Sequence, residues 1–188
     1  MNDQADQASE RGLVITVSGV HGSGRSTHAK KLAETFALRY VSSGTIFRQM
    51  ADERGINLEE MSKLTEENPE LDRMIDERAT EESKKGGVVI DATLSGWMAH
   101  DPDIRIFLKT PFEARIRRIA KREGIPYEEA EKETTVRDES ERERFQEYYN
   151  VDVSDLSIYD VILNTELYEP EGTARILKSV VEEYCSIR

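Results

Sequence analysis

A strand, a glycine-rich loop and a helix follow one another near the beginning of the chain, and this order constrains the fold more than any other feature of the sequence. The loop reads Gly-Val-His-Gly-Ser-Gly-Arg-Ser over residues 19–26 and follows the β-branched run at 13–17. Apolar residues then recur at helical spacing, at Ala29, Leu32, Ala33, Phe36 and Ala37. Glycines let backbone N–H groups turn towards a polyphosphate, and a helix N-terminus adds unpaired donors. The stretch predicts a phosphate-binding loop rather than an ordinary glycine-rich turn.

One position in this loop departs from the phosphate-loop pattern G-x-x-x-x-G-K-[ST]. Gly19, Gly24 and the hydroxyl residue Ser26 match the pattern, but Arg25 stands where it has lysine. Arginine keeps the positive charge and replaces a compact ammonium group with a wide planar fork, so the two residues are not interchangeable. We expect Arg25 to bind phosphate oxygens with an altered geometry.

Short apolar runs alternate with helical patterns along the rest of the chain. The runs that predict strands are residues 13–17, 38–42, 88–90, 104–108 and 159–164. Strands that alternate with helices form a mainly parallel sheet with helices on both faces, so we predict a five-stranded, three-layer α/β/α fold of the P-loop NTPase type. Ligands of such folds bind at the carboxyl ends of the strands. These ends bring together residues 19–26, 42–48, 91–97 and 164–165.

Two segments interrupt this alternation and overhang the same edge of the predicted sheet. Residues 44–86 form a helical insertion between the second and third strands, and residues 117–145 bear arginines on both sides of a Gly-Ile-Pro break at 124–126. A charge-laced helix is often only a solvated surface. The alternative is a lid that folds over bound phosphates, and the residue pattern leaves both open. The predicted polar face of the first arginine-bearing helix consists of Arg115, Arg117, Arg118, Lys121 and Arg122.

The composition indicates one highly charged globular domain. The 188 residues include 38 acidic and 26 basic side chains, for a formal net charge of −12. An acidic protein is a poor general binder of nucleic acid, and no apolar run approaches the ~20 residues of a membrane helix. Residues 1–12 are polar and acidic, unlike a signal or transit peptide, and we expect a frayed tail there. We predict a cytoplasmic monomer without membrane or nucleic-acid partners.

Four further side chains bear on the chemistry. Asp91 follows the strand at 88–90, where folds with a phosphate loop hold a Mg²⁺-bound water; the alternative is a turn or helix-capping aspartate. The single cysteine, Cys185, falls on the apolar face of the predicted last helix, which predicts a buried thiol and excludes an internal disulfide. His21 and His28 are predicted to lie in the loop and on the surface of its helix, and not to be ligands.

With these motifs placed, the chain resembles a nucleoside monophosphate kinase, and in particular the archaeal type of cytidylate kinase. The stretches that carry the resemblance are the loop at 19–26, Ser43-Gly44-Thr45-Ile46-Phe47-Arg48, Leu94-Ser95-Gly96-Trp97, Arg118-Ile119-Ala120-Lys121-Arg122-Glu123-Gly124 and Asp155-Leu156-Ser157-Ile158-Tyr159-Asp160. The resemblance implies a single kinase domain at 13–188, in which the insertion binds the monophosphate and the arginine-bearing segment is a short helical lid.

The resemblance further implies that ATP, with Mg²⁺, and a pyrimidine nucleoside monophosphate bind on opposite sides of the sheet edge and exchange the γ-phosphoryl group. The residues it assigns to ATP are Gly19, Gly22, Ser23, Gly24, Arg25, Ser26, Thr27 and Arg118. Those it assigns to the acceptor are Ser43, Gly44, Arg48, Gly96, Trp97, Arg137, Glu141 and Arg144. The catalytic assignments are Arg25, Arg48, Arg118, Arg122 and Arg144, and the metal assignments are Ser26 and Asp91. Phosphoryl transfer needs two anions held in line with their charge neutralised, which several fixed arginines provide.

Two positions after the third predicted strand depart from the family. Relatives usually have a glutamate and an arginine before the leucine of the Leu-Ser-Gly-Trp stretch, where this chain has Asp91 and Thr93. The missing arginine removes a contact on the acceptor side, and Arg117 and His100 are the candidates to replace it. The alternatives to a CMP or dCMP kinase are therefore a kinase of the same fold with another acceptor, such as UMP, AMP or a non-nucleotide, and a nucleotide-binding protein without turnover.

Overall fold

The computed structural model describes residues 12–68 and 70–187, so the predicted tail lies almost wholly outside the described residues. Five strands form one sheet in the order β2-β3-β1-β4-β5, and all neighbouring strands run parallel. The strands are β1 (Val14–Gly19), β2 (Arg39–Ser42), β3 (Val88–Asp91), β4 (Ile104–Lys109) and β5 (Val161–Asn164). The predicted five-stranded α/β/α fold is confirmed.

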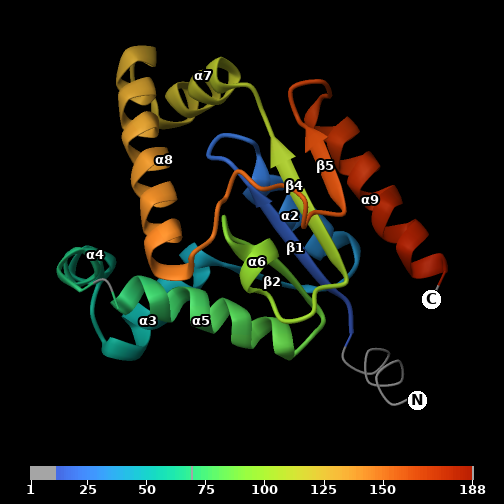
Figure 1. Ribbon diagram of the computed structural model, residues 1–188, viewed down its shortest axis with the longest axis horizontal. Coiled ribbons are helices and arrows are strands. Elements are labelled where there is room, and N and C mark those ends of the chain that lie inside the picture. The colour runs from blue at the N-terminus through green and yellow to red at the C-terminus, as the bar shows by residue number, and fades with distance from the viewer. Residues whose placement is uncertain (1–11, 69, 188) are drawn as a thin grey trace.

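Eight helices lie in this part of the chain, seven between the strands and the last, α9, after β5 (Figure 1). They are α2 (Arg25–Thr35), α3 (Ser43–Arg54), α4 (Leu58–Glu67), α5 (Glu70–Lys84), α6 (Ser95–Met98), α7 (Phe112–Glu123), α8 (Tyr127–Tyr149) and α9 (Pro170–Ser186). Residues 95–98 form the one-turn helix α6, which is too short for a periodic pattern to reveal. Among the described helices, none is both long and apolar enough to cross a membrane.

The sheet is covered by different helices on its two faces. On one face, α2 and α9 bury Leu32 and Leu177 against β1, β3 and β4. On the other, α3, α4 and α5 pack Ile46, Met61 and Ile75 against β2 and β3. The alternate residues of the buried strands supply these two cores, as expected for a parallel sheet covered on both sides.

The ends of the insertion helices follow from local capping. Ser42 caps α3 through a hydrogen bond from the Thr45 backbone N–H, while the Thr45 hydroxyl accepts from the Ser42 N–H. Gly55 ends α3 with φ of +66°, and Asn57 then starts α4 by accepting from the backbone N–H of Glu60. These reciprocal bonds satisfy donors that a helix start otherwise leaves unpaired.

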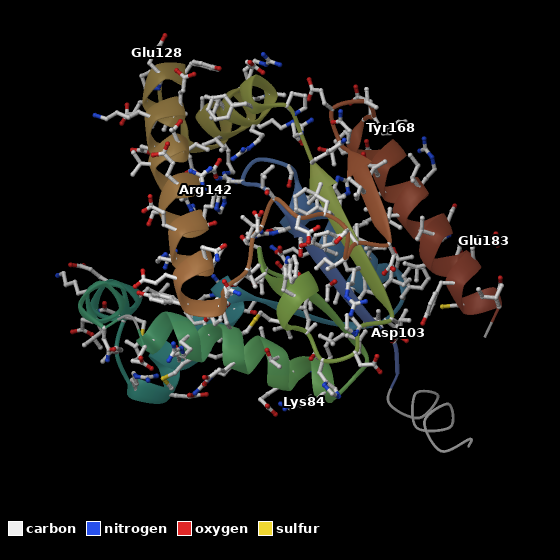
Figure 2. The ribbon with its side chains drawn as sticks, in the orientation of Figure 1. Lys84, Asp103, Glu128, Arg142, Tyr168 and Glu183 are labelled. Atoms are coloured by element: carbon white, nitrogen blue, oxygen red, sulfur yellow. The ribbon has the colours of Figure 1, made fainter. Side chains whose placement is uncertain are left out.

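The two arginine-bearing helices form a separate layer beside the carboxyl edge of the sheet. Helix α7 ends at the predicted break, and α8 then runs from α7 down to the insertion (Figure 1). A small core of Ile116, Ile119 and Ala130 joins α7 to α8. In Figure 2, Glu128 marks the end of α8 next to α7 and Tyr168 marks the turn after β5, while Asp103 lies at the opposite, amino-terminal end of β4.

Candidate active site

The loop between β1 and α2 has the backbone geometry of a phosphate cradle. Gly19 has φ of +150°, and a Cβ atom there would lie 2.4 Å from the carbonyl oxygen of Leu108. Gly22 has φ of +81°, and a Cβ atom there would lie 3.0 Å from the carbonyl oxygen of Arg115. Both positions therefore require glycine. Gly24 is the N-cap of α2 and no side chain caps this helix, so its first N–H groups are available to an anion.

The guanidinium group of Arg25 is held by three hydrogen bonds on the β3 side of this loop. Its Nε donates to Asp91 Oδ1 over 2.6 Å, and its Nη1 donates to the Gly19 carbonyl oxygen and to Thr93 Oγ1, each over 2.9 Å. The other carboxylate oxygen of Asp91 accepts a hydrogen bond from Tyr40 Oη over 2.6 Å. Of the three positions that depart from the kinase pattern, Arg25 thus contacts the other two, Asp91 and Thr93.

Tyr40 supports this cluster from β2. Burial, followed by the hydrogen bond to Asp91, raises the pKa of Tyr40 to about 12. The phenol therefore remains protonated at neutral pH and keeps donating to the carboxylate. Weaker interactions of the same phenol with Ser26 and Ser42 place the first turn of α2 and the start of α3 in the same cluster.

A cavity of about 240 Å³ opens beside Arg25, between the loop, α5 and α8. Five residues that the sequence assigned to the acceptor or to catalysis line it: Arg25, Ser43, Arg137, Glu141 and Arg144. Sequence reasoning missed four others on its walls: Asp76 of α5 and Phe145, Tyr148 and Tyr149 of α8. The spacing of the three aromatic residues, at i, i+3 and i+4, was the available signal, because it places them on one face of a helix.

A larger cavity of about 620 Å³ lies on the other side of the loop, towards α9. The residues assigned to ATP that line it are Gly22, Ser23, Gly24, Thr27 and Arg118, together with Arg122. The turn after β5 closes this cavity with Leu167 and Tyr168, whose side chains are exposed. Sequence reasoning placed Asn164 and Thr165 at this edge but did not identify the apolar pair that follows them.

Arg118 is tied to the turn after β5. Its Nη1 donates to Thr165 Oγ1 over 2.9 Å, and its Nη2 donates to Glu166 Oε2 over 2.8 Å. Thr165 in turn donates to the carbonyl oxygen of Ser23 over 2.9 Å. The phosphate loop, α7 and the turn after β5 are therefore connected through one buried hydroxyl group.

Helix α8 is attached to the phosphate loop at two points. His21 Nε2 donates to Glu141, with distances of 2.9 and 3.0 Å to the two carboxylate oxygens. Arg115 donates to the His21 carbonyl oxygen and to Asp138 Oδ2, each over 2.6 Å. Burial on its own would raise the pKa of Glu141, but His21, with a smaller contribution from Arg137, lowers it below its ordinary value. Glu141 is therefore a carboxylate at neutral pH.

Seven assigned residues lie outside the walls of both cavities: Gly19 and Asp91, described above, and Ser26, Gly44, Arg48, Gly96 and Trp97. Ser26 is exposed in the first turn of α2. Gly44 and Arg48 are exposed on α3, and within residues 12–68 and 70–187 the Arg48 guanidinium has neither a hydrogen bond nor an ion pair. Gly96 is buried against the Tyr159 ring, and Trp97 lies beside it on α6. Their assignment to the acceptor stays a prediction.

Three side chains lie elsewhere than the sequence predicted. Arg115 was expected on the polar face of α7, but it is buried because it reaches back to the loop and pairs with Asp138. His28 was expected on the helix surface but is buried under α9 and lines the larger cavity, where burial and the charge of Arg118 lower its pKa. Cys185 was expected in the core but is exposed, because it lies in the last turn of α9. In all three cases the outcome depends on packing between distant segments.

Sequence similarity to known proteins identifies the family. A family model described as an AAA domain matches residues 18–137. The cytidylate kinase of Pyrococcus horikoshii is 48% identical over 170 residues, which cover 90% of this chain and 88% of that protein. The cytidylate kinase of Staphylothermus marinus is 42% identical over 173 residues, which cover 92% of this chain and 98% of that protein.

Solved structures show the same fold at low sequence identity. An uncharacterized protein from Eubacterium ventriosum matches with a TM-score of 0.63 at 16% identity, over 90% of this chain and 98% of that chain. Taken with the loop geometry and the sequence identities above, these similarities lead to one assignment. The chain belongs to the cytidylate kinase family of nucleoside monophosphate kinases.

Proposed function

We propose that this protein transfers the γ-phosphoryl group of ATP to CMP or dCMP, giving ADP and CDP or dCDP. The observation that carries the proposal is the pair of cavities on either side of one phosphate loop. Gly22 and Gly24 line the larger cavity, whereas His21 and Arg25 line the smaller one, so the loop is a wall of both. ATP in the larger cavity and a monophosphate in the smaller cavity would meet at their phosphates over this loop.

The larger cavity suits the donor nucleotide. The uncapped N-terminus of α2 offers N–H groups and a positive dipole end to the β- and γ-phosphates. Arg118 and Arg122 add positive charge beside them. Leu167 and Tyr168 present apolar surface at the far wall, against which an adenine ring can pack. We therefore assign this cavity to ATP.

Two residues that Tyr40 links, Ser26 and Asp91, fit the Mg²⁺ that accompanies ATP. Mg²⁺ prefers hard oxygen ligands and usually keeps several waters beside one or two carboxylates and the substrate phosphates. Ser26 offers an exposed hydroxyl group, and the Asp91 carboxylate belongs to the same cluster through Tyr40. Because Asp91 is already bonded to Arg25 and Tyr40, we assign it to a metal-bound water and Ser26 to the metal itself. The ion would neutralise phosphate charge.

The smaller cavity suits a cytosine nucleotide. Phe145 and Tyr148 provide flat surfaces on which a base stacks. The Asp76 carboxylate on the opposite wall can accept a hydrogen bond from the exocyclic amino group of cytosine. Uracil carries a carbonyl oxygen at that position, which a carboxylate repels. The preference for cytosine over uracil depends on the Asp76 carboxylate, and Phe145 and Tyr148 supply the stacking surface.

The lid residues complete the chemistry that phosphoryl transfer needs. The reaction requires little covalent help, so positioning, charge neutralisation and exclusion of water provide most of the rate. The bonds from His21 to Glu141 and from Arg115 to Asp138 hold α8 over the loop. Arg137 and Arg144 then face the acceptor from α8. A lid in this position keeps water from accepting the phosphoryl group.

An acceptor panel tests the proposal. ADP release from Mg·ATP would be measured with CMP, dCMP, UMP, AMP, GMP and without an acceptor. The proposal expects turnover to be highest with CMP or dCMP. Highest turnover with another acceptor would identify a different kinase of the same family, and ADP release no faster than the acceptor-free rate, with ATP still bound, would indicate a nucleotide-binding protein without turnover.

A further inference from the structure

The phosphate-loop arginine faces the acceptor cavity and not the donor cavity. Arg25 is among the residues that line the smaller cavity, whereas the larger cavity is lined by its neighbours Gly24 and Thr27. The hydrogen bonds to Asp91 and Thr93 draw its side chain sideways, towards the end of β3. A lysine at this position of the pattern serves the β- and γ-phosphates of the donor, so the direction of this side chain is unexpected.

Hydrogen bonds fix the guanidinium group of Arg25 and leave one of its nitrogen atoms available to a ligand. Nε and Nη1 are occupied by Asp91, Gly19 and Thr93. Nη2 has no hydrogen-bond partner among the residues that the structure describes, and the side chain is 17% exposed. Because two of its three nitrogens are fixed, little conformational entropy is lost when Nη2 binds an anion.

The two residues named as replacements for the missing arginine, Arg117 and His100, do not reach this place. Arg117 is exposed on α7, 3.8 Å from Glu166 at the turn after β5. His100 is exposed just after α6, and its backbone N–H donates to Ser83 Oγ over 2.7 Å. Neither residue lines the smaller cavity. Arg25 is the cation that the phosphate loop itself places in this cavity. The phosphate of the acceptor must lie next to this loop for phosphoryl transfer.

We infer that Arg25 binds the phosphate group of the acceptor and so positions it for attack on ATP. This inference rests on the proposed function. Asp91 and Tyr40 hold the arginine in place, and the short side chain of Thr93 leaves room for it and accepts one of its bonds. Arg25 is thereby a residue that determines acceptor affinity, although its position in the sequence belongs to the donor loop.

The first test separates the two nucleotides by binding rather than by turnover. Titration calorimetry would measure the Kd of CMP and of Mg·ATP, separately, for the wild type and for Arg25→Ala, Arg25→Lys and Arg117→Ala. We expect Arg25→Ala to raise the Kd of CMP about 10- to 100-fold, as for loss of one charge-assisted hydrogen bond. The Kd of ATP should change less than about threefold, which also shows that the variant is folded. Arg117→Ala is the control that removes the same charge and should change neither value.

The second test uses residue 93. In the wild type, Thr93→Arg would place two guanidinium groups in the space of one and should weaken CMP binding. In the Arg25→Lys protein, the lysine no longer fills that space, and the same Thr93→Arg change should strengthen CMP binding. The inference thus predicts that one substitution has opposite effects in two backgrounds. Equal effects of Thr93→Arg in both would contradict it.

The outcomes distinguish this inference from the proposed function. If the wild type binds ATP but no nucleoside monophosphate, the proposed function fails and the inference fails with it. If the wild type binds CMP, and Arg25→Ala raises the Kd of ATP at least as much as the Kd of CMP, the proposed function stands and the inference is overturned. If Arg25→Ala raises the Kd of CMP alone, the inference is supported.

Discussion

The hydroxyl group of Tyr149, at the end of α8, donates a hydrogen bond to Oδ2 of Asp76 on α5 over 2.8 Å. The two residues lie 73 positions apart and join the lid helix to the insertion across the smaller cavity. The bond orients a carboxylate on the wall where we propose that the base binds. One contact therefore links α8 to the carboxylate that we propose recognises the base.

Asp76 should control the choice between cytosine and uracil. The substitution Asp76→Asn removes the negative charge and adds an N–H donor, so it should lower kcat/KM for CMP about 10- to 100-fold and improve the relative use of UMP. Steady-state rates with both acceptors give the ratio. Tyr149→Phe is the matched control, because it keeps the carboxylate and should preserve the preference for CMP. An unchanged CMP-to-UMP ratio in Asp76→Asn would remove Asp76 from base recognition.

Arg118 should contribute to the binding of ATP and not to the binding of CMP. Its substitution by alanine removes a charge from the larger cavity and frees the turn after β5 from α7. We expect the Kd of ATP to rise about 10- to 100-fold, with the Kd of CMP changed less than about threefold. Calorimetric titration of each nucleotide measures both values. Arg117→Ala, one position away and exposed, should leave both values near those of the wild type, and a rise in the Kd of CMP in Arg118→Ala would argue against two separate cavities.

The pair of His21 and Glu141 should make the free energy of unfolding depend on pH in the acid range. Because the pKa of Glu141 in the folded protein lies below 4.5, the unfolded chain binds the proton more readily. The stabilisation is therefore fully present above pH 4.5 and is lost as the pH falls through the folded-state pKa. Glu141→Gln should be about 1–3 kcal/mol less stable than the wild type at neutral pH, and this difference should disappear in acid.

Denaturant unfolding at a series of pH values measures this difference. The control is the same substitution in a His21→Ala protein. There the main cause of the lowered pKa is absent, so the dependence on pH should be much weaker. If Glu141→Gln stays less stable by a constant amount down to strong acid, the carboxylate is not stabilised by the histidine.

We expect glycine to be required at position 96 because the Tyr159 ring leaves no space for a side chain there. A Cβ atom at Gly96 would lie 2.6 Å from Cε1 of Tyr159, whose ring packs on Phe107 at a centroid distance of 5.0 Å. Gly96→Ala should therefore cost about 1–3 kcal/mol of unfolding free energy. Adding Tyr159→Leu should recover part of this loss, which a double-mutant cycle detects.

The matched control is Gly172→Ala in α9. Its Cβ atom would lie 3.5 Å from the nearest atom, in Tyr168, which is an ordinary van der Waals contact. Alanine also has a higher helix propensity than glycine. We expect no loss of stability. If Gly96→Ala is as stable as the wild type, the explanation of the Leu-Ser-Gly-Trp stretch by packing against Tyr159 is wrong.

The fold could be predicted because its signals are local. The β-branched run before Gly19 and the helical spacing after Ser26 each indicate one element without knowledge of the rest. Gly55 and Asn57 mark helix ends by their own backbone and side-chain preferences, and the structure has those ends in place. The alternation of such elements determines a parallel sheet.

The site could be predicted only in part, because the direction of a side chain depends on distant neighbours. The pattern identified Arg25 as a phosphate ligand, but its pairing with Asp91 and Thr93 depends on how β3 lies beside β1. Nothing in the sequence distinguishes Asp76 from the other acidic residues of its charged helix. Its place on the cavity wall, bonded to Tyr149, depends on how α8 packs beside α5.

The central claim is that two nucleotides meet at their phosphates across one loop. A bisubstrate compound in which a pentaphosphate joins adenosine to cytidine tests it most directly by titration calorimetry. The account predicts that one molecule binds per chain, more tightly than ATP or CMP alone, and that it prevents the binding of both. Binding no tighter than that of ATP, or a complex that still takes up CMP, would contradict the account.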